Sequence, residues 1–168
     1  MKLFGINKAR YRRHLKFVLA GSVGALVIGS LVLSQLLIAL FPDESGSHFH
    51  WNLLGVAVTA VIIAWLLNKV RQHDFMTEVV YVWELKQALN KINRKMRQLE
   101  AAAREGNATA LLAIHYSYVG SRLLWQLDDN TLTMDELTIK QAELNVMAKK
   151  FKVTLNTDDY AECMLKQF

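Results

Sequence analysis

FVLAGSVGALVIGSLVLSQLLIALF, residues 17–41, is a run of 25 residues without an ionisable side chain, and it is the strongest indication of the fold. As an α-helix it would be roughly 37 Å long, whereas the hydrocarbon core of a bilayer is about 30 Å thick. A second uncharged stretch, WNLLGVAVTAVIIAWLL at residues 51–67, is 17 residues long, at the short end of the spanning range. The sequence therefore predicts a hairpin of two transmembrane helices, at residues 17–41 and 51–68.

The first apolar stretch follows a basic segment, as the core of a signal peptide also does. It is, however, longer than the roughly 7–15 apolar residues of such a core, and no small-x-small cleavage site closes it. A second apolar stretch also follows it. We therefore expect this helix to remain in the mature protein.

Charge is distributed unevenly among the segments that flank the two predicted helices. Residues 1–16 contain six basic and no acidic side chains, residues 42–50 contain two acidic and no basic ones, and residues 69–168 are nearly neutral. Because Lys and Arg resist translocation, we expect a basic cytoplasmic arm at 1–16, a periplasmic loop at 42–50 and a cytoplasmic helical domain at 69–168, with both termini cytoplasmic. The arm can also contact acidic headgroups. The nearly neutral domain argues against nucleic-acid binding.

Three small residues spaced by four, Gly21, Ala25 and Gly29, form a stripe along the first predicted helix. Small side chains allow the backbones of two membrane helices to approach closely. The stripe suits packing of the two predicted spans on each other, and dimerisation of two chains is the alternative. Neither span contains an ionisable side chain, which argues against a transport pathway.

The predicted outer loop contains two histidines, His48 and His50, close in sequence to Asp43 and Glu44. Imidazole and carboxylate groups are ligands for zinc or copper, so His48 and His50 are candidate metal ligands. The alternative is an ordinary polar turn whose aromatic and histidine side chains lie in the headgroup region.

From Met76 onward the apolar residues follow helical spacing, with steps of three and four that form one seam. The seam consists of Val82, Leu85, Leu89, Ile92, Met96, Leu99 and Ala103. A seam of this kind is buried inside a bundle, which we favour, or pairs with its copy as a coiled coil. Because residues 51–105 contain no proline and one glycine, the second span can run with little break into this helix as a stalk. If the stalk has a kink, the polar residues 72–74 are the place for it.

Further helix signals complete the cytoplasmic domain. Gly106 is expected to end the first bundle helix and Asn107 to cap the second. Thr133 and Glu136 have the spacing of a capping box for the third, and a short helix is expected to start near Asn156. The predicted fold class is all-α, a transmembrane helical hairpin followed by a cytoplasmic antiparallel helical bundle.

One face of the second bundle helix carries the best candidates for a binding site. Steps of three and four bring together an imidazole, a phenol, a guanidinium and an indole, those of His115, Tyr118, Arg122 and Trp125. If exposed, this face suits an anionic ligand or a partner protein. The alternative is a polar seam inside the bundle, in which Arg122 pairs with a carboxylate. The carboxylates considered for that pair are Glu84, Asp128 and Glu136.

The chain contains none of the sequence patterns typical of phosphate, dinucleotide, zinc-protease or dithiol chemistry. Its single cysteine, Cys163, is consistent with a reducing cytoplasm. We therefore expect that the protein has no enzymatic activity and binds no cofactor. The favoured hypothesis is a membrane-anchored interaction or scaffold protein that contacts the bilayer and either a protein partner or a second copy. The alternative is a small envelope sensor or accessory subunit whose histidine loop binds a metal or a periplasmic partner.

Four segments resemble an uncharacterised family of gammaproteobacterial inner-membrane proteins. They are FPD at 41–43, SHFHWN at 47–52, VYVWELKQ at 80–87 and GSRLLWQLDDNT at 120–131. The family is known as domain of unknown function three thousand and eighty-seven, and the resemblance covers nearly the whole chain. It implies location in the bacterial inner membrane, and it implies no activity.

Overall fold

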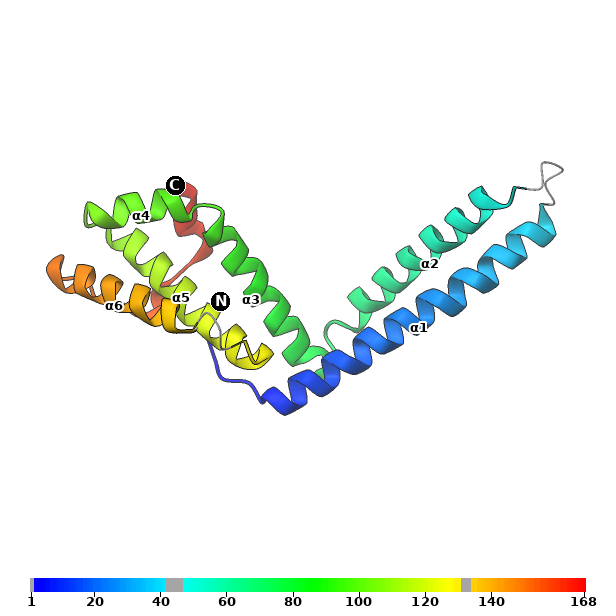
Figure 1. Ribbon diagram of the computed structural model, residues 1–168, viewed down its shortest axis with the longest axis horizontal. Coiled ribbons are helices and arrows are strands. Elements are labelled where there is room, and N and C mark those ends of the chain that lie inside the picture. Colours follow the sequence, from blue (N-terminus) through cyan, green and yellow to red (C-terminus); the bar gives the residue numbers. More distant parts are fainter. Residues whose placement is uncertain (1, 42–46, 131–133) are drawn as a thin grey trace. The chain divides into compact units, whose positions relative to one another are not determined.

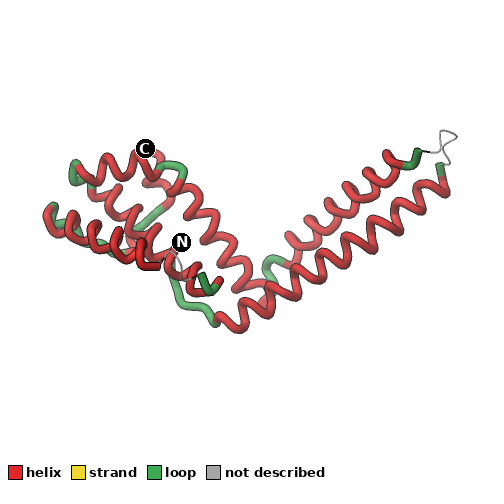
Figure 2. Tube along the Cα trace, viewed as in Figure 1, coloured by secondary structure: helices red, strands yellow, loops and turns green. Residues whose placement is uncertain are grey.

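The computed structural model describes residues 2–41, 47–130 and 134–168, and the regular elements within these ranges are helices (Figure 2). The α-helices are α1 (Lys8–Leu40), α2 (Phe49–Val70), α3 (Thr77–Asn93), α4 (Met96–Arg104), α5 (Ala108–Asp128) and α6 (Met134–Lys150). Three 3₁₀ helices are η1 (Asp74–Met76), η2 (Thr157–Asp159) and η3 (Glu162–Gln167). The predicted all-α class, a helical hairpin followed by a packed bundle, is confirmed.

The chain divides into two compact units, which we describe separately. The hairpin unit is Ala9–Val80, and the bundle unit combines Met1–Lys8 with Tyr81–Phe168. In the hairpin unit α1 and α2 run side by side (Figure 1). Both helices are long and apolar enough to cross a membrane, and most of their large apolar side chains are exposed. α1 begins at Lys8, so it includes half of the basic arm as well as the apolar run.

Close packing between α1 and α2 occurs at one glycine on each helix. A Cβ atom on Gly29 of α1 would lie 2.8 Å from Cγ2 of Thr59. A Cβ atom on Gly55 of α2 would overlap Oγ of Ser34 and lie 3.1 Å from the carbonyl oxygen of Ser30. The side chains of Ser34 and Thr59 are buried here, and the hydroxyl of Thr59 donates to the carbonyl of Gly55 at 2.7 Å. Small residues therefore allow the close approach of the two helices.

The predicted small-residue stripe coincides with this interface at one position. Gly29 lies in it, whereas Ala25 is exposed and a Cβ atom on Gly21 would have no neighbour within 4 Å. Dimerisation through the stripe stays a prediction, as do the domain boundaries inferred from charge.

A break separates α2 from α3, so the two do not form an uninterrupted stalk. α2 ends at Val70, and the chain passes through η1 before α3 begins at Thr77. The break includes residues 72–74, the place that the sequence indicated for a kink if the stalk had one. The imidazole Nδ1 of His73 accepts a hydrogen bond from the N–H of Phe75 at 3.2 Å and so caps η1. Polar side chains that bond the local backbone favour such a turn over a continuing helix.

In the bundle unit α5 is the central helix, because α4, α6, η2 and η3 all pack on it. Residues on several sides of this helix are buried, including Ala113, Ser117 and Gly120. A Cβ atom on Gly120 would lie 2.9 Å from Cδ2 of Leu89, so α3 and α5 also approach closely.

The predicted seam is buried within the chain, which confirms the intramolecular bundle. Of its seven residues only Met96 is half-buried, and the other six are fully buried. The seam belongs to two helices, however, because α3 ends at Asn93 and α4 begins at Met96. At this break the N–H of Lys95 donates to the carbonyl of Ile92 at 2.9 Å, and Nζ of Lys95 donates to the carbonyl of Leu165 at 2.7 Å. The sequence did not reveal the break, since the apolar spacing continues through it.

The turn between α4 and α5 has both predicted caps. Gly106 has a φ angle of 88°, and its N–H donates to the carbonyl of Ala103 at 3.0 Å. The N–H of Asn107 donates to the carbonyl of Ala102 at 3.0 Å, which completes a Schellman motif. The side chain of Asn107 then accepts from the N–H of Ala110 at 3.1 Å and caps α5.

The predicted start of the C-terminal helix is also confirmed, because Oδ1 of Asn156 accepts from the N–H of Asp158 at 3.0 Å. The single short helix expected there is instead two 3₁₀ helices, η2 and η3, with Tyr160 and Ala161 between them. Thr133, the first residue of the predicted capping box, lies outside the described residues.

The start of the basic arm packs on the rest of the bundle unit. The rings of Phe4 and Tyr81 lie 4.0 Å apart between centroids. The hydroxyl of Tyr81 accepts from the N–H of Phe4 at 3.0 Å and donates to its carbonyl at 3.3 Å. Lys8 forms an ion pair with Asp129. This contact between the first residues and the bundle was not predicted from the sequence.

Candidate functional site

Two adjoining hollows lie among α4, α5 and α6, with volumes of about 380 Å³ and about 140 Å³. Both are lined by Glu100 of α4, Tyr118 of α5 and Lys140 of α6. We call the two hollows together the interhelical cleft. Met96 and Trp125 add apolar surface to the larger hollow. The cleft therefore combines aromatic surface with charges of both signs.

Two of the charged groups that line the cleft, Glu136 and Lys140, form an ion pair on α6. Nζ of Lys140 lies 2.7 Å from Oε1 of Glu136, one helical turn before it. This hydrogen bond raises the pKa of Lys140 and lowers the pKa of Glu136, so both groups are charged at neutral pH. Burial, with a contribution from the charge of Glu100, raises the pKa of Tyr118. Its hydroxyl therefore keeps its proton and can both donate and accept a hydrogen bond.

The structure places the four predicted site residues in different surroundings. Tyr118 and Trp125 line the interhelical cleft. Arg122 instead holds α5 to α6, because its Nη2 donates to Oε1 of Gln141 at 2.9 Å and to Oγ1 of Thr138 at 3.2 Å. His115 is half-buried, and burial lowers the pKa of its imidazole. Two of the four side chains therefore line the cleft, and the use of the whole face for binding stays a prediction.

Two of the three carboxylates considered as partners of Arg122, those of Asp128 and Glu136, are paired with lysines instead. Lys86 lies 3.3 Å from Asp128, and Lys140 is bound to Glu136. Arg122 is thus part of a polar seam, as the alternative interpretation proposed, but its partners are neutral side chains. Glu100 and Lys140 were not predicted as site residues from the sequence, although the four-residue spacing of Glu136 and Lys140 is typical of an ion pair on a helix.

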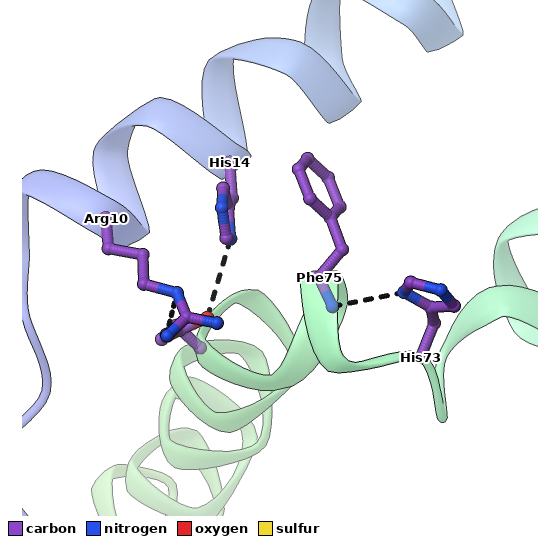
Figure 3. A network of polar contacts seen from close by, with 5 residues as sticks. Arg10, His14, His73 and Phe75 are labelled. Atoms are coloured by element: carbon purple, nitrogen blue, oxygen red, sulfur yellow. Dashed lines mark hydrogen bonds and ion pairs between the residues drawn. The ribbon is translucent and has the colours of Figure 1, made fainter.

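A second polar cluster lies in the hairpin unit, where α1 faces the start of α3. Nε of Arg10 lies 2.9 Å from Oε1 of Glu78, and Nδ1 of His14 lies 3.5 Å from Oε2 of the same carboxylate. The imidazole of His14 also stacks on the ring of Phe75, with centroids 4.1 Å apart. Figure 3 shows Arg10 and His14 projecting from one helix toward the segment that carries Phe75 and His73. We call Arg10, His14, Phe75 and Glu78 the Glu78 cluster.

Beside this cluster an apolar groove of about 400 Å³ opens between α1, the end of α2 and η1. We call it the basal groove. Its walls are Phe17, Val18, Gly21, Ser22, Leu67, Val70, His73, Phe75 and Met76. The Glu78 cluster fixes one wall, because His14 on α1 stacks on Phe75, which lines the groove.

His48 and His50 do not form a described metal centre. The rings of His50 and Trp51 lie 4.8 Å apart, and Nδ1 of His48 is buried without a hydrogen-bond partner within the described part of the chain. Asp43 and Glu44, the carboxylates considered with them, lie outside that part. Among residues 2–41, 47–130 and 134–168, no three potential ligands gather around a common point. Metal binding by this loop stays a prediction.

Comparison with known proteins gives one match. A family model described as a protein of unknown function (DUF3087) matches residues 1–165. No curated protein and no solved structure matches the chain.

Proposed function

Because the chain belongs to the DUF3087 family, whose function is unknown, we propose a role from its own architecture: a non-catalytic, membrane-anchored interaction protein of the bacterial inner membrane. The helical hairpin is the anchor, and the interhelical cleft of the bundle unit is the surface that binds another protein or a second copy of the chain. Support comes separately for the anchor, its orientation and the cleft.

The exposure of α1 and α2 supports the anchor. Side chains such as Ile28 and Val61 are 66% and 68% exposed, and they belong to apolar surfaces that extend along both helices. A soluble monomer rarely exposes contiguous apolar surface larger than a few hundred Å². Helices also satisfy their own backbone hydrogen bonds, as lipid requires. Lipid is therefore the environment in which these two helices are best accommodated.

Charge supports an orientation with both termini in the cytoplasm. The basic residues before Phe17 and the pair Lys69 and Arg71 flank the ends of α1 and α2 that are remote from the connecting segment. Lys and Arg at these ends oppose translocation. This orientation exposes the bundle unit to cytoplasmic proteins.

The interhelical cleft gives the main support for the interaction role. The cleft brings together side chains from three helices, which are Glu100 of α4, Tyr118 and Trp125 of α5, and Lys140 of α6. Aromatic side chains that combine a large apolar body with a polar tip are enriched at protein interfaces and dominate their energetics. A partner segment with one apolar anchor and flanking charges of both signs would complement this surface.

Site-specific photo-crosslinking in intact membranes tests the interaction role. A photoreactive amino acid at Ser121, which lines the larger hollow, is expected to capture a reproducible partner. The matched control has the same photoreactive group at Val146, an exposed position on α6 that does not line either hollow. Mass spectrometry then identifies the captured chain, and capture of the same chain indicates a homo-oligomer. Capture at neither position, or equal capture at both, would contradict a role for the cleft.

Two standard measurements test the anchor. Alkaline carbonate extraction is expected to leave the protein in the membrane pellet, and a cytoplasm-active reporter fused after Phe168 is expected to be active. Release into the supernatant would contradict membrane insertion. Activity of only a periplasmic reporter at the same position would contradict the orientation.

A further inference from the structure

We propose that the basal groove binds one anionic phospholipid of the cytoplasmic leaflet, with part of an acyl chain in the groove and the phosphate near Arg13 and Lys16. This proposal rests on the proposed insertion of the hairpin into the membrane. It assigns a specific ligand site to a place where the proposed function requires only general lipid contact.

The position of the groove in the sequence matches the boundary between headgroups and hydrocarbon. Lys16 is the last charged residue of α1 before the apolar run, and Phe17 is the first wall residue of the groove. On α2, the wall residues Leu67 and Val70 flank Lys69, the first charged residue after the apolar run. The groove therefore begins at the level where lipid acyl chains begin.

The volume and lining of the groove suit an acyl chain. About 400 Å³ is within the roughly 300–1,000 Å³ of ligand pockets. Most of its walls are aliphatic or aromatic, and Phe17 and Val70 remain 64% and 46% exposed. In a membrane, an open apolar groove at this depth is filled by the hydrocarbon beside it. The apolar lining of the groove accounts for binding of an acyl chain. The charges near the groove determine which lipid headgroup is bound.

The charges around the groove favour an anionic headgroup. In the two segments that flank the apolar runs, residues 9–16 and 69–80, the basic residues are Arg10, Arg12, Arg13, Lys16, Lys69 and Arg71, and the acidic residues are Asp74 and Glu78. Glu78 is already engaged by Arg10 and His14. Arg13 lies one helical turn before Phe17, and both Arg13 and Lys16 are exposed. Basic residues at the cytoplasmic end of a helix pair are the known setting for anionic lipid headgroups.

His73 adds a hydrogen-bond donor at the groove. It lines the groove, and its Nδ1 accepts the hydrogen bond from Phe75. The neutral imidazole therefore carries its proton on Nε2, since one ring nitrogen is the acceptor. An N–H at this position can donate to a phosphate or ester oxygen.

Gly21 keeps the groove open and provides the sharpest test. It lines the groove, and a Cβ atom added to it would meet no atom within 4 Å. A leucine at this position therefore starts from free space at its Cβ atom and extends into the groove that we assign to the acyl chain. Gly24 is the matched control, because it lies on the same helix, also has free space around its Cβ position, and does not line the groove.

The experiment is native mass spectrometry of the full-length protein with added phosphatidylglycerol or phosphatidylcholine. We expect the wild type to retain one phosphatidylglycerol in preference to phosphatidylcholine. Gly21→Leu is expected to weaken this binding about tenfold, the effect of excluding about two methylene groups from an apolar site. Gly24→Leu is expected to bind as the wild type does. Arg13→Gln with Lys16→Gln is expected to remove the headgroup preference, whereas Lys149→Gln with Lys166→Gln in the bundle unit is expected to keep it.

Several results would overturn the proposal. Equal retention of the two lipids by the wild type would exclude an anionic headgroup site. Equal binding by Gly21→Leu and Gly24→Leu would show that the groove does not hold the acyl chain. Carbonate extraction of the same membranes separates these results from a failure of the anchor, because a protein without the lipid site would still remain in the pellet.

Discussion

Arg10 on α1 and Glu78 on α3 form an ion pair, with 2.9 Å from Nε to Oε1, in which the Glu78 side chain is only 12% exposed. Glu78→Gln removes the negative charge that both Arg10 and His14 face. Because the Arg10 side chain is half exposed and screened by water, we expect a loss of about 1 kcal/mol of local stability. Hydrogen–deuterium exchange should then show about fivefold faster exchange of the amides at residues 74–80.

The control for this prediction is Asp135→Asn. Glu78 and Asp135 both lie in the first turn of a helix, where a carboxylate stabilises the helix dipole. Asp135 is exposed, so its substitution measures the contribution of the dipole without a buried ion pair. If Asp135→Asn accelerated exchange at the start of α6 as much as Glu78→Gln does at the start of α3, the pair with Arg10 would contribute nothing.

Tyr160 packs on Tyr116 in the bundle core, with ring centroids 4.2 Å apart. The hydroxyl of Tyr160 is buried and has no hydrogen-bond partner among the described residues. Tyr160→Phe removes this group and keeps the stacked ring, so we expect the free energy of unfolding to rise by about 0.5–1 kcal/mol. Tyr160→Leu loses the ring contact and is expected to lower it by about 1 kcal/mol. Chemical unfolding of the full-length protein in detergent, followed by near-ultraviolet circular dichroism, measures both; a destabilised Tyr160→Phe would contradict the unpaired hydroxyl.

The same two tyrosines predict a loss of stability at alkaline pH. Burial raises the pKa of Tyr116 and of Tyr160 to about 12 from 10.0, with contributions from Tyr81 for Tyr116 and from Tyr116 for Tyr160. A raised folded-state pKa contributes stability below pH 10, and this stability is lost as the pH rises toward about 12. Unfolding measured at a series of alkaline pH values should therefore show a steeper decline for the wild type than for Tyr160→Phe. Parallel curves would show that Tyr160 does not titrate in this range.

Much of the fold could be predicted because its signals are local. The uncharged run from Phe17 specifies a helix, and Gly106 and Asn107 specify the end of one helix and the start of the next. The break between α3 and α4 could not be predicted in this way. At this break Lys95 donates a hydrogen bond to Leu165, a residue far along the chain, while the apolar spacing continues across the break.

The candidate sites were less predictable because each depends on contacts between distant segments. Helical spacing placed Tyr118 and Trp125 on one face of α5, and both line the interhelical cleft. It gave no indication that Arg122 would bind Gln141 on α6. The basal groove was not predicted at all, since it requires the break after α2 that brings Phe75 next to His14.

The close contact at Gly55 predicts how the hairpin responds to added volume. Gly55→Val places a side chain against Ser34 and the backbone of Ser30, so we expect a loss of about 1–3 kcal/mol, the usual cost of overpacking. Gly24→Val is the control, because a Cβ atom there has no neighbour within 4 Å. Thermal unfolding in detergent should show a lower Tm for Gly55→Val alone. Equal Tm values for the two variants would mean that α1 and α2 do not pack at Gly55.

His115 predicts that the bundle loses stability in acid. Burial lowers the pKa of this imidazole from its ordinary value of 6.5, so the unfolded chain binds the proton more tightly than the folded chain does. The free energy of unfolding should therefore be unaffected well above pH 6.5 and should fall as the pH decreases through 6.5 toward the lower folded-state value. His115→Gln removes the titrating group and is expected to flatten this dependence. Because the wild type and His115→Gln share every other titrating group, the difference between their two curves isolates the His115 imidazole. Superimposable curves for the wild type and His115→Gln would mean that its protonation is the same in the folded and unfolded chains.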